Sequence, residues 1–172
     1  MPRRVTLIRH AAPMTSADVD PAEWRLSPAG RRAATALGPR IPEPAALASS
    51  TELKAVETLS FATGRAAAEL HLDRRFGEVV RPGEPYDDDH RSRRLAWVEG
   101  RPDDRHRTWE SLAQAAARFQ AGLDDFDGDV VVATHGMVLT AWLVSRGVVR
   151  PGAEAGDFWT RLAFPDLINT DL

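Results

Sequence analysis

Two histidines in this chain each follow a short apolar segment directly. Residues 5–8 (Val-Thr-Leu-Ile) lead into Arg9 and His10, and residues 130–134 (Val-Val-Val-Ala-Thr) lead into His135. Such β-branched runs predict buried strands, and chemical groups gather at the carboxyl ends of strands in open α/β sheets. If the two strands are neighbours, both imidazoles and the guanidinium converge on a pocket for an anion, most plausibly phosphate. The alternative, that each ring only caps its strand and bonds to backbone, does not account for the matched repetition.

Alternating strand-like and helical segments predict an α/β sheet layered by helices. Strands are expected at residues 5–8, 45–48 and 130–133. The first helix has clear boundaries: Ser27 suits the N-cap, Pro28 suits the first helical position, and the Gly-Pro pair at 38–39 ends the helix.

Apolar residues at helical spacing predict three more helices. One begins near Thr51 and places apolar residues at 55, 59, 62, 66 and 70. Another follows Thr108, with apolar residues at 109, 112, 116, 119 and 123. Residues 137–144 predict a final helix that starts directly after the second histidine. Residues 81–107 are turn-rich and highly charged, and two interpretations stay open for them: a lid over the site, or a solvated surface loop.

Composition limits the class of protein. A length of 172 residues suits one domain over residues 1–172, and 43% hydrophobic with 27% charged residues is typical of a soluble globular protein. A net charge of −3 gives no electrostatic reason to expect a nucleic-acid or membrane partner. The chain has no cysteine, no signal-peptide pattern and no apolar stretch long enough to span a bilayer. We therefore expect a cytoplasmic protein, either a monomer or a homodimer.

An ordered set of motifs resembles the histidine phosphatase (phosphoglycerate mutase-like) superfamily. The set begins with Arg9-His10 and continues with Leu-Ser-Pro-Ala-Gly at 26–30, Ser49-Ser50-x-x-x-Lys54-Ala55-x-x-Thr58, Glu78 and finally His135-Gly136. The landmarks span nearly the whole chain. The resemblance implies a three-layer α/β/α sandwich with a mostly parallel central sheet, and it implies no cofactor.

The resemblance also implies roles for the residues at the two strand ends. His10 would be the nucleophile and carry a phosphohistidine intermediate, with its other ring nitrogen donating to a backbone carbonyl. Arg9 would bind phosphate oxygens, and a protonated His135 would stabilise charge on the transferring group. Gly136 would leave room for phosphate to approach the start of its helix, whose N–H groups favour anions.

Lys54 stands where the family normally has a second arginine. A lysine keeps the charge and loses the planar, two-pronged grip on phosphate. A cation at the start of a helix opposes the helix dipole, which favours a nearby anion and thus a phosphate-binding role. The alternative is an ordinary helix lysine.

Glu78 is the predicted general acid, because the family's catalytic glutamate follows the third core strand in similar surroundings. A partly buried glutamate facing phosphate would have a raised pKa and could protonate the leaving oxygen. Its rivals are Glu52, which would satisfy a helix N-terminus, Glu84, and the aspartates at 87–89, which suit a solvated face. The family's other branch places its acid directly after the second histidine, and Gly136 argues against that branch.

Other features bear on the substrate and on metals. Ala11, Ser16 and Ala33 depart from common family residues and affect substrate contacts more than the central chemistry. No carboxylate and histidine spacing suggests a metal site, and three further histidines are expected on the surface or in loops: His71, His90 and His106.

The sequence thus predicts a metal-independent phosphatase that acts on phosphomonoesters or on protein phosphohistidine through His10. The compact size resembles that of short bacterial phosphatases whose substrate is a phosphorylated small molecule or a phosphoprotein. Two alternatives stay open. One is a phosphate-binding or regulatory module with weakened catalysis, which the Lys54 replacement favours, and the other is a small phosphomutase.

Overall fold

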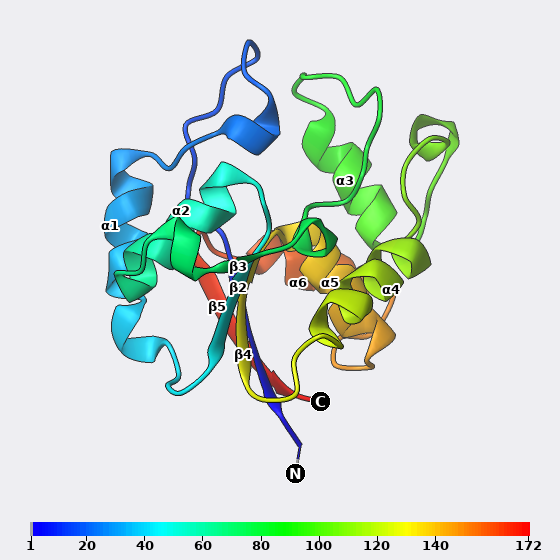
Figure 1. Cartoon of the computed structure of the whole chain (residues 1–172). Coiled ribbons are helices and arrows are strands. Elements are labelled where there is room, and N and C mark those ends of the chain that lie inside the picture. The colour runs from blue at the N-terminus through cyan, green and yellow to red at the C-terminus, as the bar shows by residue number, and fades with distance from the viewer. Residues whose placement is uncertain (1) are drawn as a thin grey trace.

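A mixed β-sheet lies at the centre of the fold (Figure 1). The computed structural model describes residues 2–172. Within them the strands run in the order β3-β2-β4-β1-β5, and only β5 is antiparallel to its neighbour. Their bounds are β1 Arg4–Arg9, β2 Ala46–Ser49, β3 His71–Leu72, β4 Val130–Thr134 and β5 Asp166–Asp171.

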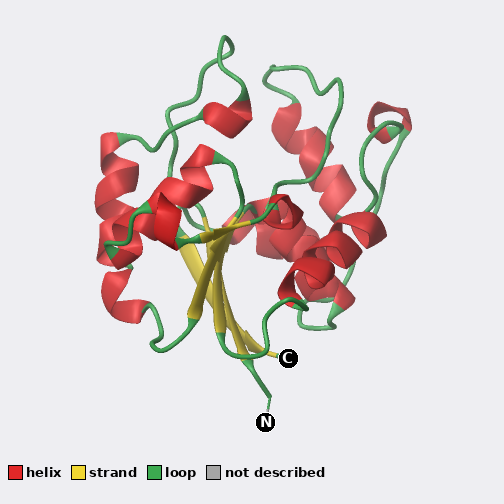
Figure 2. Ribbon diagram, viewed as in Figure 1, coloured by secondary structure: helices red, strands yellow, loops and turns green. Residues whose placement is uncertain are grey.

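Helices cover both faces of this sheet (Figure 2). One layer contains α1 (Pro28–Ala36) and α2 (Leu53–Thr63), and the other contains α3 (His90–Val98), α4 (Leu112–Leu123), α5 (Gly136–Ser145) and α6 (Ala153–Arg161). Side chains alternate between the two cores: Ile8 and Val131 pack with α2, whereas Leu7 and Val132 pack with α4 and α5. The predicted three-layer α/β/α fold is confirmed.

The strands β1 and β4 are adjacent and parallel, as the two histidine motifs require. Their register pairs Arg9 with Thr134. The His10 N–H continues the ladder and donates to the Thr134 carbonyl over 3.0 Å. Both strands therefore end at one level, and His10 and His135 leave the same edge of the sheet. The predicted convergence of the two strand ends is confirmed.

Helix boundaries follow the local signals where caps are strong. The helix α1 begins at Pro28, and the Ser27 side chain accepts the Gly30 N–H, as predicted. The helix α2 ends at Thr63 because Gly64 adopts a left-handed conformation with φ of 70°. The predicted continuation of this helix to residue 70 is wrong. The helix after Thr108 starts at Leu112, where Ser111 forms a capping box, so Trp109 precedes it.

Four of the helices and strands are not predicted by the sequence: β3, α3, α6 and β5. Residues 81–107 contain α3, and the chain continues beyond α5 through α6 to β5, so α5 is not the last element. The helix α3 begins with charged residues and has few apolar positions, whereas β5 is a short edge strand that exposes alternate residues. Neither pattern gives a strong periodic signal by itself. Both elements depend on the sheet and helices against which they pack.

Candidate active site

His10 follows β1, and contacts with its own backbone fix its ring. Its Nδ1 lies 2.8 Å from the Ala11 carbonyl, as the sequence predicts. A carbonyl only accepts, so Nδ1 carries the proton and the neutral ring keeps a lone pair on Nε2. Burial lowers the pKa of His10 well below its usual value, and the charges of Lys54 and Arg9 lower it further. His10 is thus neutral and suited to nucleophilic attack through Nε2.

His135 follows β4, and side chains hold its ring. Its Nε2 lies 2.9 Å from Ser50 Oγ and 3.4 Å from Glu52 Oε1. The Ser50 hydroxyl already accepts the Glu52 N–H over 3.1 Å, so its own proton is free for Nε2. Burial above all, and then the Lys54 charge, lowers the pKa of His135 to about 3. The His135 ring is therefore neutral in this arrangement, and its expected protonation during phosphoryl transfer stays a prediction.

The two imidazoles lie together in a nearly closed site. Their ring centroids are 5.2 Å apart, and His10 is 8% and His135 1% exposed. Within residues 2–172, Nδ1 of His135 and Nε of Arg9 are buried and have no hydrogen-bond partner. Buried polar groups are nearly always paired, so two unpaired ones beside a nucleophile indicate a place for a polar ligand.

Arg9 takes part in packing as well as facing the site. Its Nη1 donates to the Leu162 carbonyl over 2.6 Å, and its guanidinium carbon lies 3.5 Å from the centre of the Phe164 ring. Burial lowers its pKa to about 10, so the group stays charged at neutral pH. The buried, unpaired Nε is one N–H group that remains for the predicted phosphate role. The sequence analysis does not predict the contact of Phe164 with Arg9, because Phe164 follows α6 and is far from Arg9 in the sequence.

Gly136 allows close packing at the start of α5, and its predicted role in the approach of phosphate stays a prediction. A Cβ at this position would lie 3.1 Å from Arg9 Nε and 3.1 Å from Trp159 Nε1. The missing side chain therefore lets Arg9 and Trp159 approach α5, and phosphate does not need to occupy that space. The N–H groups expected to receive phosphate at the start of this helix are bonded to a carboxylate of the protein itself.

That carboxylate belongs to Glu78. It accepts the N–H of Met137 over 3.2 Å and the N–H of Val138 over 2.9 Å, so it caps α5. Burial by itself would raise the pKa of Glu78, but the Arg81 charge and the donated N–H groups lower it below its usual value. Glu78 is thus ionised in this arrangement, and the raised pKa expected for a glutamate that faces phosphate stays a prediction.

Lys54 and Glu52 form an ion pair at the edge of the site. Lys54 Nζ lies 2.5 Å from Glu52 Oε2 and donates to the Pro21 carbonyl over 2.6 Å. The other carboxylate oxygen of Glu52 accepts the Glu78 N–H over 2.9 Å. Glu52 occupies the N-cap of α2, but its side chain makes no capping bond, so its expected role at the helix N-terminus is wrong. Two of the three Lys54 protons are used, and one is left for a ligand.

The remaining family motifs hold the loop that follows His10. The Ala11 N–H donates to Thr58 Oγ1 over 2.9 Å, and Ser27 Oγ donates to the Ala12 carbonyl over 3.0 Å. A Cβ on Gly30 would come within 2.2 Å of that same carbonyl oxygen, so only glycine fits there. These contacts explain why the motifs around residues 26–30 and 54–58 belong to the site although they carry no reactive group.

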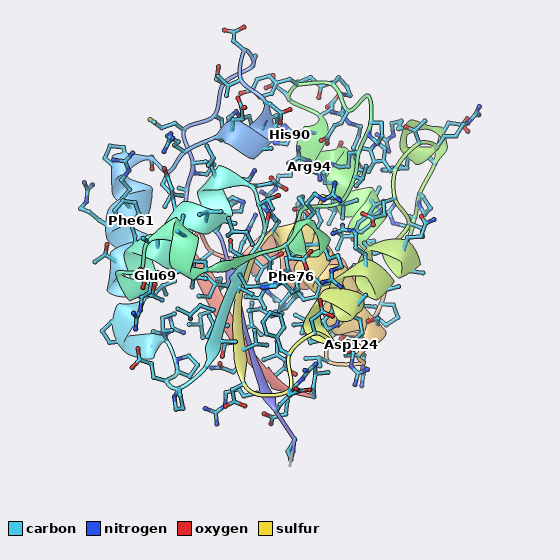
Figure 3. All side chains as sticks on the ribbon, viewed as in Figure 1. Phe61, Glu69, Phe76, His90, Arg94 and Asp124 are labelled. Carbon is cyan, nitrogen blue, oxygen red and sulfur yellow. The ribbon has the colours of Figure 1, made fainter. Side chains whose placement is uncertain are left out.

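Residues 81–107 form a braced cover at the same end of the sheet, where Figure 3 shows His90 and Arg94 on α3. Glu84 pairs with both Arg81 and Arg94 at 2.8 Å, and its low pKa suits a structural carboxylate. Tyr86 contacts Trp24 of the other upper loop, with ring centroids 6.3 Å apart. The segment is therefore more ordered than a solvated loop.

Two residues of this segment, Asp87 and His106, are less exposed to solvent than the sequence predicts. Asp87 binds the buried Arg93 guanidinium at 2.8 Å, so this aspartate is not simply solvated. His106 is buried, with Nε2 2.8 Å from the Arg93 carbonyl and Nδ1 accepting the Asp103 N–H over 3.0 Å, which corrects its expected surface position. His71 and His90 are exposed, as predicted.

Searches for two other kinds of feature were negative for the described part of the chain. Residues 2–172 contain no group of three histidine, cysteine, aspartate or glutamate side chains placed to hold a metal ion. None of the helices described here is both long and apolar enough to cross a membrane.

Residues 5–151 match the family model of the histidine phosphatase superfamily, branch 1. The chain belongs to this superfamily. Membership confirms the family and the enzyme class, phosphoric monoester hydrolase, that the sequence predicts. No curated protein matches the chain significantly.

Solved structures of other histidine phosphatases share the fold. A mycobacterial glucosyl-3-phosphoglycerate phosphatase aligns with a TM-score of 0.70 and 20% identity over 98% of this chain and 90% of its own. The same enzyme with VO3 gives a TM-score of 0.65 and 25% identity over 90% and 86%. A phosphoserine phosphatase variant from Entamoeba histolytica in complex with phosphoserine gives a TM-score of 0.69 and 16% identity over 96% and 89%.

Proposed function

We propose that this histidine phosphatase hydrolyses phosphomonoesters through a phosphohistidine intermediate on His10. The carrying observation is the bond from Nδ1 to the Ala11 carbonyl, which leaves Nε2 as the reactive atom beside two unpaired buried groups. A phosphate between the imidazoles would receive hydrogen bonds from Arg9 Nε, from His135 Nδ1 and from the third proton of Lys54. We infer that this set binds phosphate and that no divalent metal is needed.

In the first step, Nε2 of His10 forms a bond to phosphorus, and the bond from phosphorus to the leaving oxygen breaks. The leaving oxygen needs a proton. Glu78 is ionised in the empty site, but a bound phosphate adds negative charge nearby and raises the pKa of the carboxyl group. Binding of the monoanionic ester would supply that proton, which Glu78 then passes to the leaving oxygen.

In the second step, water attacks phosphorus and the bond between phosphorus and Nε2 breaks. The ionised Glu78 takes a proton from that water and so acts as the general base. The same phosphate charge raises the pKa of His135, so its ring is protonated only while phosphate is bound. Both expected roles are therefore proposed for the occupied site.

The substrate is proposed as a phosphorylated small molecule. Two proteins of similar structure are named as phosphatases of such compounds, one of glucosyl-3-phosphoglycerate and the other of phosphoserine. These substrates are those of the two relatives. The low exposure of His10 favours a substrate whose phosphate can enter a narrow site. A binding module with weakened catalysis is the second candidate, because Lys54 is already paired and Glu78 ionised.

The test is to trap the intermediate. The protein is mixed with labelled p-nitrophenyl phosphate in the presence of a chelator, quenched, and analysed for covalent phosphate. We expect label that is stable to base and labile to acid, absent from His10→Ala and present in His71→Ala, which changes an exposed histidine. Turnover in chelator without any trapped label, or label that survives acid, would contradict the mechanism. Binding of phosphate without turnover of any phosphomonoester would favour the binding module.

A further inference from the structure

We propose that Glu52 sets the phosphate affinity of the site by competing with phosphate for Lys54. This inference rests on the proposed phosphate site between the two imidazoles. Glu52 is a positioning residue: it acts through Lys54 and through the charge it adds to the site, and not on the reacting atoms.

Glu52 contacts Lys54, His135 and the backbone of Glu78. One carboxylate oxygen holds Lys54 Nζ at 2.5 Å, and the other accepts the Glu78 N–H and lies 3.4 Å from Nε2 of His135. Its side chain is 18% exposed and that of Lys54 is 7% exposed. Both charges are therefore largely removed from water.

This placement has two opposite effects on an anion. In the empty site, the carboxylate compensates the buried Lys54 ammonium, which would be costly to leave unpaired. In the occupied site, the same carboxylate repels the phosphate next to His135, because like charges a few ångströms apart interact strongly in a water-poor site. The lysine charge that phosphate experiences is thus partly cancelled.

The effects of substituting Glu52 and Lys54 on phosphate affinity should consequently not be additive. Removing Glu52 exposes the full Lys54 charge to phosphate and removes a repulsion. Removing Lys54 does the opposite, because it deletes a cation and leaves the carboxylate uncompensated. Removing both should restore much of the affinity that the loss of Lys54 alone destroys.

The experiment titrates inorganic phosphate into the wild type, Glu52→Gln, Lys54→Ala and the double variant by calorimetry. We expect about tenfold tighter binding in Glu52→Gln. Lys54→Ala should bind roughly ten- to a hundredfold more weakly, as expected for loss of a charged hydrogen bond. The double variant should bind at least about tenfold more tightly than Lys54→Ala.

Glu57→Gln is the matched control. Glu57 lies on the same helix, its side chain is 15% exposed, it pairs with Arg25 at 2.7 Å, and it accepts the Leu26 N–H over 2.8 Å. Both substitutions remove a carboxylate that pairs with a cation and accepts a backbone N–H, but Glu57 pairs with the exposed Arg25 rather than with Lys54 and His135. Glu57→Gln should therefore leave phosphate affinity unchanged.

Unchanged or weaker phosphate binding in Glu52→Gln would overturn the inference, as would a double variant no tighter than Lys54→Ala. With p-nitrophenyl phosphate as substrate, KM should fall in Glu52→Gln together with the inhibition constant of phosphate, whereas a merely structural loss would raise KM. The binding assay needs no turnover, so it separates the two proposals. A wild type that binds phosphate but forms no phosphohistidine contradicts the proposed function. The titrations of the four proteins still decide whether Glu52 sets the phosphate affinity.

Discussion

The imidazole after β1 and the imidazole after β4 lie side by side but are held in different ways. His10 is oriented by the carbonyl of the next residue, which leaves the lone pair on Nε2. His135 is oriented through Nε2 by the side chain of Ser50, and its Nδ1 is the atom left without a partner. Each ring therefore leaves a different nitrogen for a ligand, Nε2 in His10 and Nδ1 in His135.

This difference separates the two roles more clearly than exposure or charge does, because both rings are buried and neutral. A nucleophile must keep one tautomer through every turnover, and a backbone carbonyl supplies a partner that no side-chain substitution can remove. A charge-stabilising ring must instead gain a proton when phosphate arrives, and a hydroxyl can either donate to Nε2 or accept from it.

The largest expected effect comes from deleting each ring in turn. His10→Ala should lower kcat at least about a thousandfold and abolish the covalent intermediate, because it removes the proposed nucleophile. His135→Ala should lower kcat by about a hundredfold while phosphohistidine still forms, because only electrostatic stabilisation is lost. Rapid-quench kinetics with labelled p-nitrophenyl phosphate measures both.

The variants need unchanged folding to be compared, which circular dichroism checks. Equal losses in both variants together with label in neither would mean that the rings act as one unit, and the division of roles would be wrong. Appreciable turnover in His10→Ala would remove the nucleophile from the mechanism altogether.

The ends of β1 and β4 could be predicted from the sequence because their signals are local. A buried strand followed at once by a histidine fixes where that histidine emerges, and parallel pairing brings the two ends to one edge. Ser27 and Pro28 likewise mark the start of α1 by their own chemistry. The motif around Thr58 could be placed near His10 only through the resemblance to the family.

The charge state of the site could not be predicted in this way. The low pKa of Glu78 depends on α5, which offers it two N–H groups, and on Arg81, and neither follows from the residues around Glu78. Glu52 was assigned to a helix end because that assignment is local, whereas its partners come from three separate segments. The Pro21 carbonyl opposite Lys54 is equally distant in the sequence.

The second expected effect is on stability, because both rings are buried and neutral. The pKa of His135 falls from 6.5 in the unfolded chain to about 3 in the folded one. Between these values the unfolded chain binds a proton that the folded chain does not, so stability is lost as pH falls through this window. For His135 this should cost about 1–2 kcal/mol between pH 6.5 and 5, because the slope approaches 1.4 kcal/mol per pH unit only below pH 6.5.

Urea unfolding of the wild type and His135→Asn at these two pH values checks this expectation. Between the two pH values, the free energy of unfolding should change less in His135→Asn than in the wild type, by the contribution of one histidine. This difference does not depend on the stability of the variant at pH 6.5. His90→Asn is the control, since this histidine is exposed. Parallel pH dependence in the wild type and His135→Asn would show that His135 titrates normally and would undermine its assignment as a neutral ring.

The smallest expected effect tests the way in which His135 is held. Ser50→Ala removes the hydroxyl 2.9 Å from Nε2, so the ring loses its orienting partner while the backbone contact of His10 is untouched. One lost hydrogen bond is worth on the order of 1 kcal/mol, so kcat should fall about fivefold while phosphohistidine still forms at His10. Ser49→Ala is the matched control, because Ser49 is also buried at the end of β2 and donates over 2.8 Å to the Ser50 carbonyl. It should lower the melting temperature and leave kcat within about twofold. A wild-type rate in Ser50→Ala would show that the hydroxyl does not orient His135, and the contrast between backbone and side-chain support would then not explain the two roles.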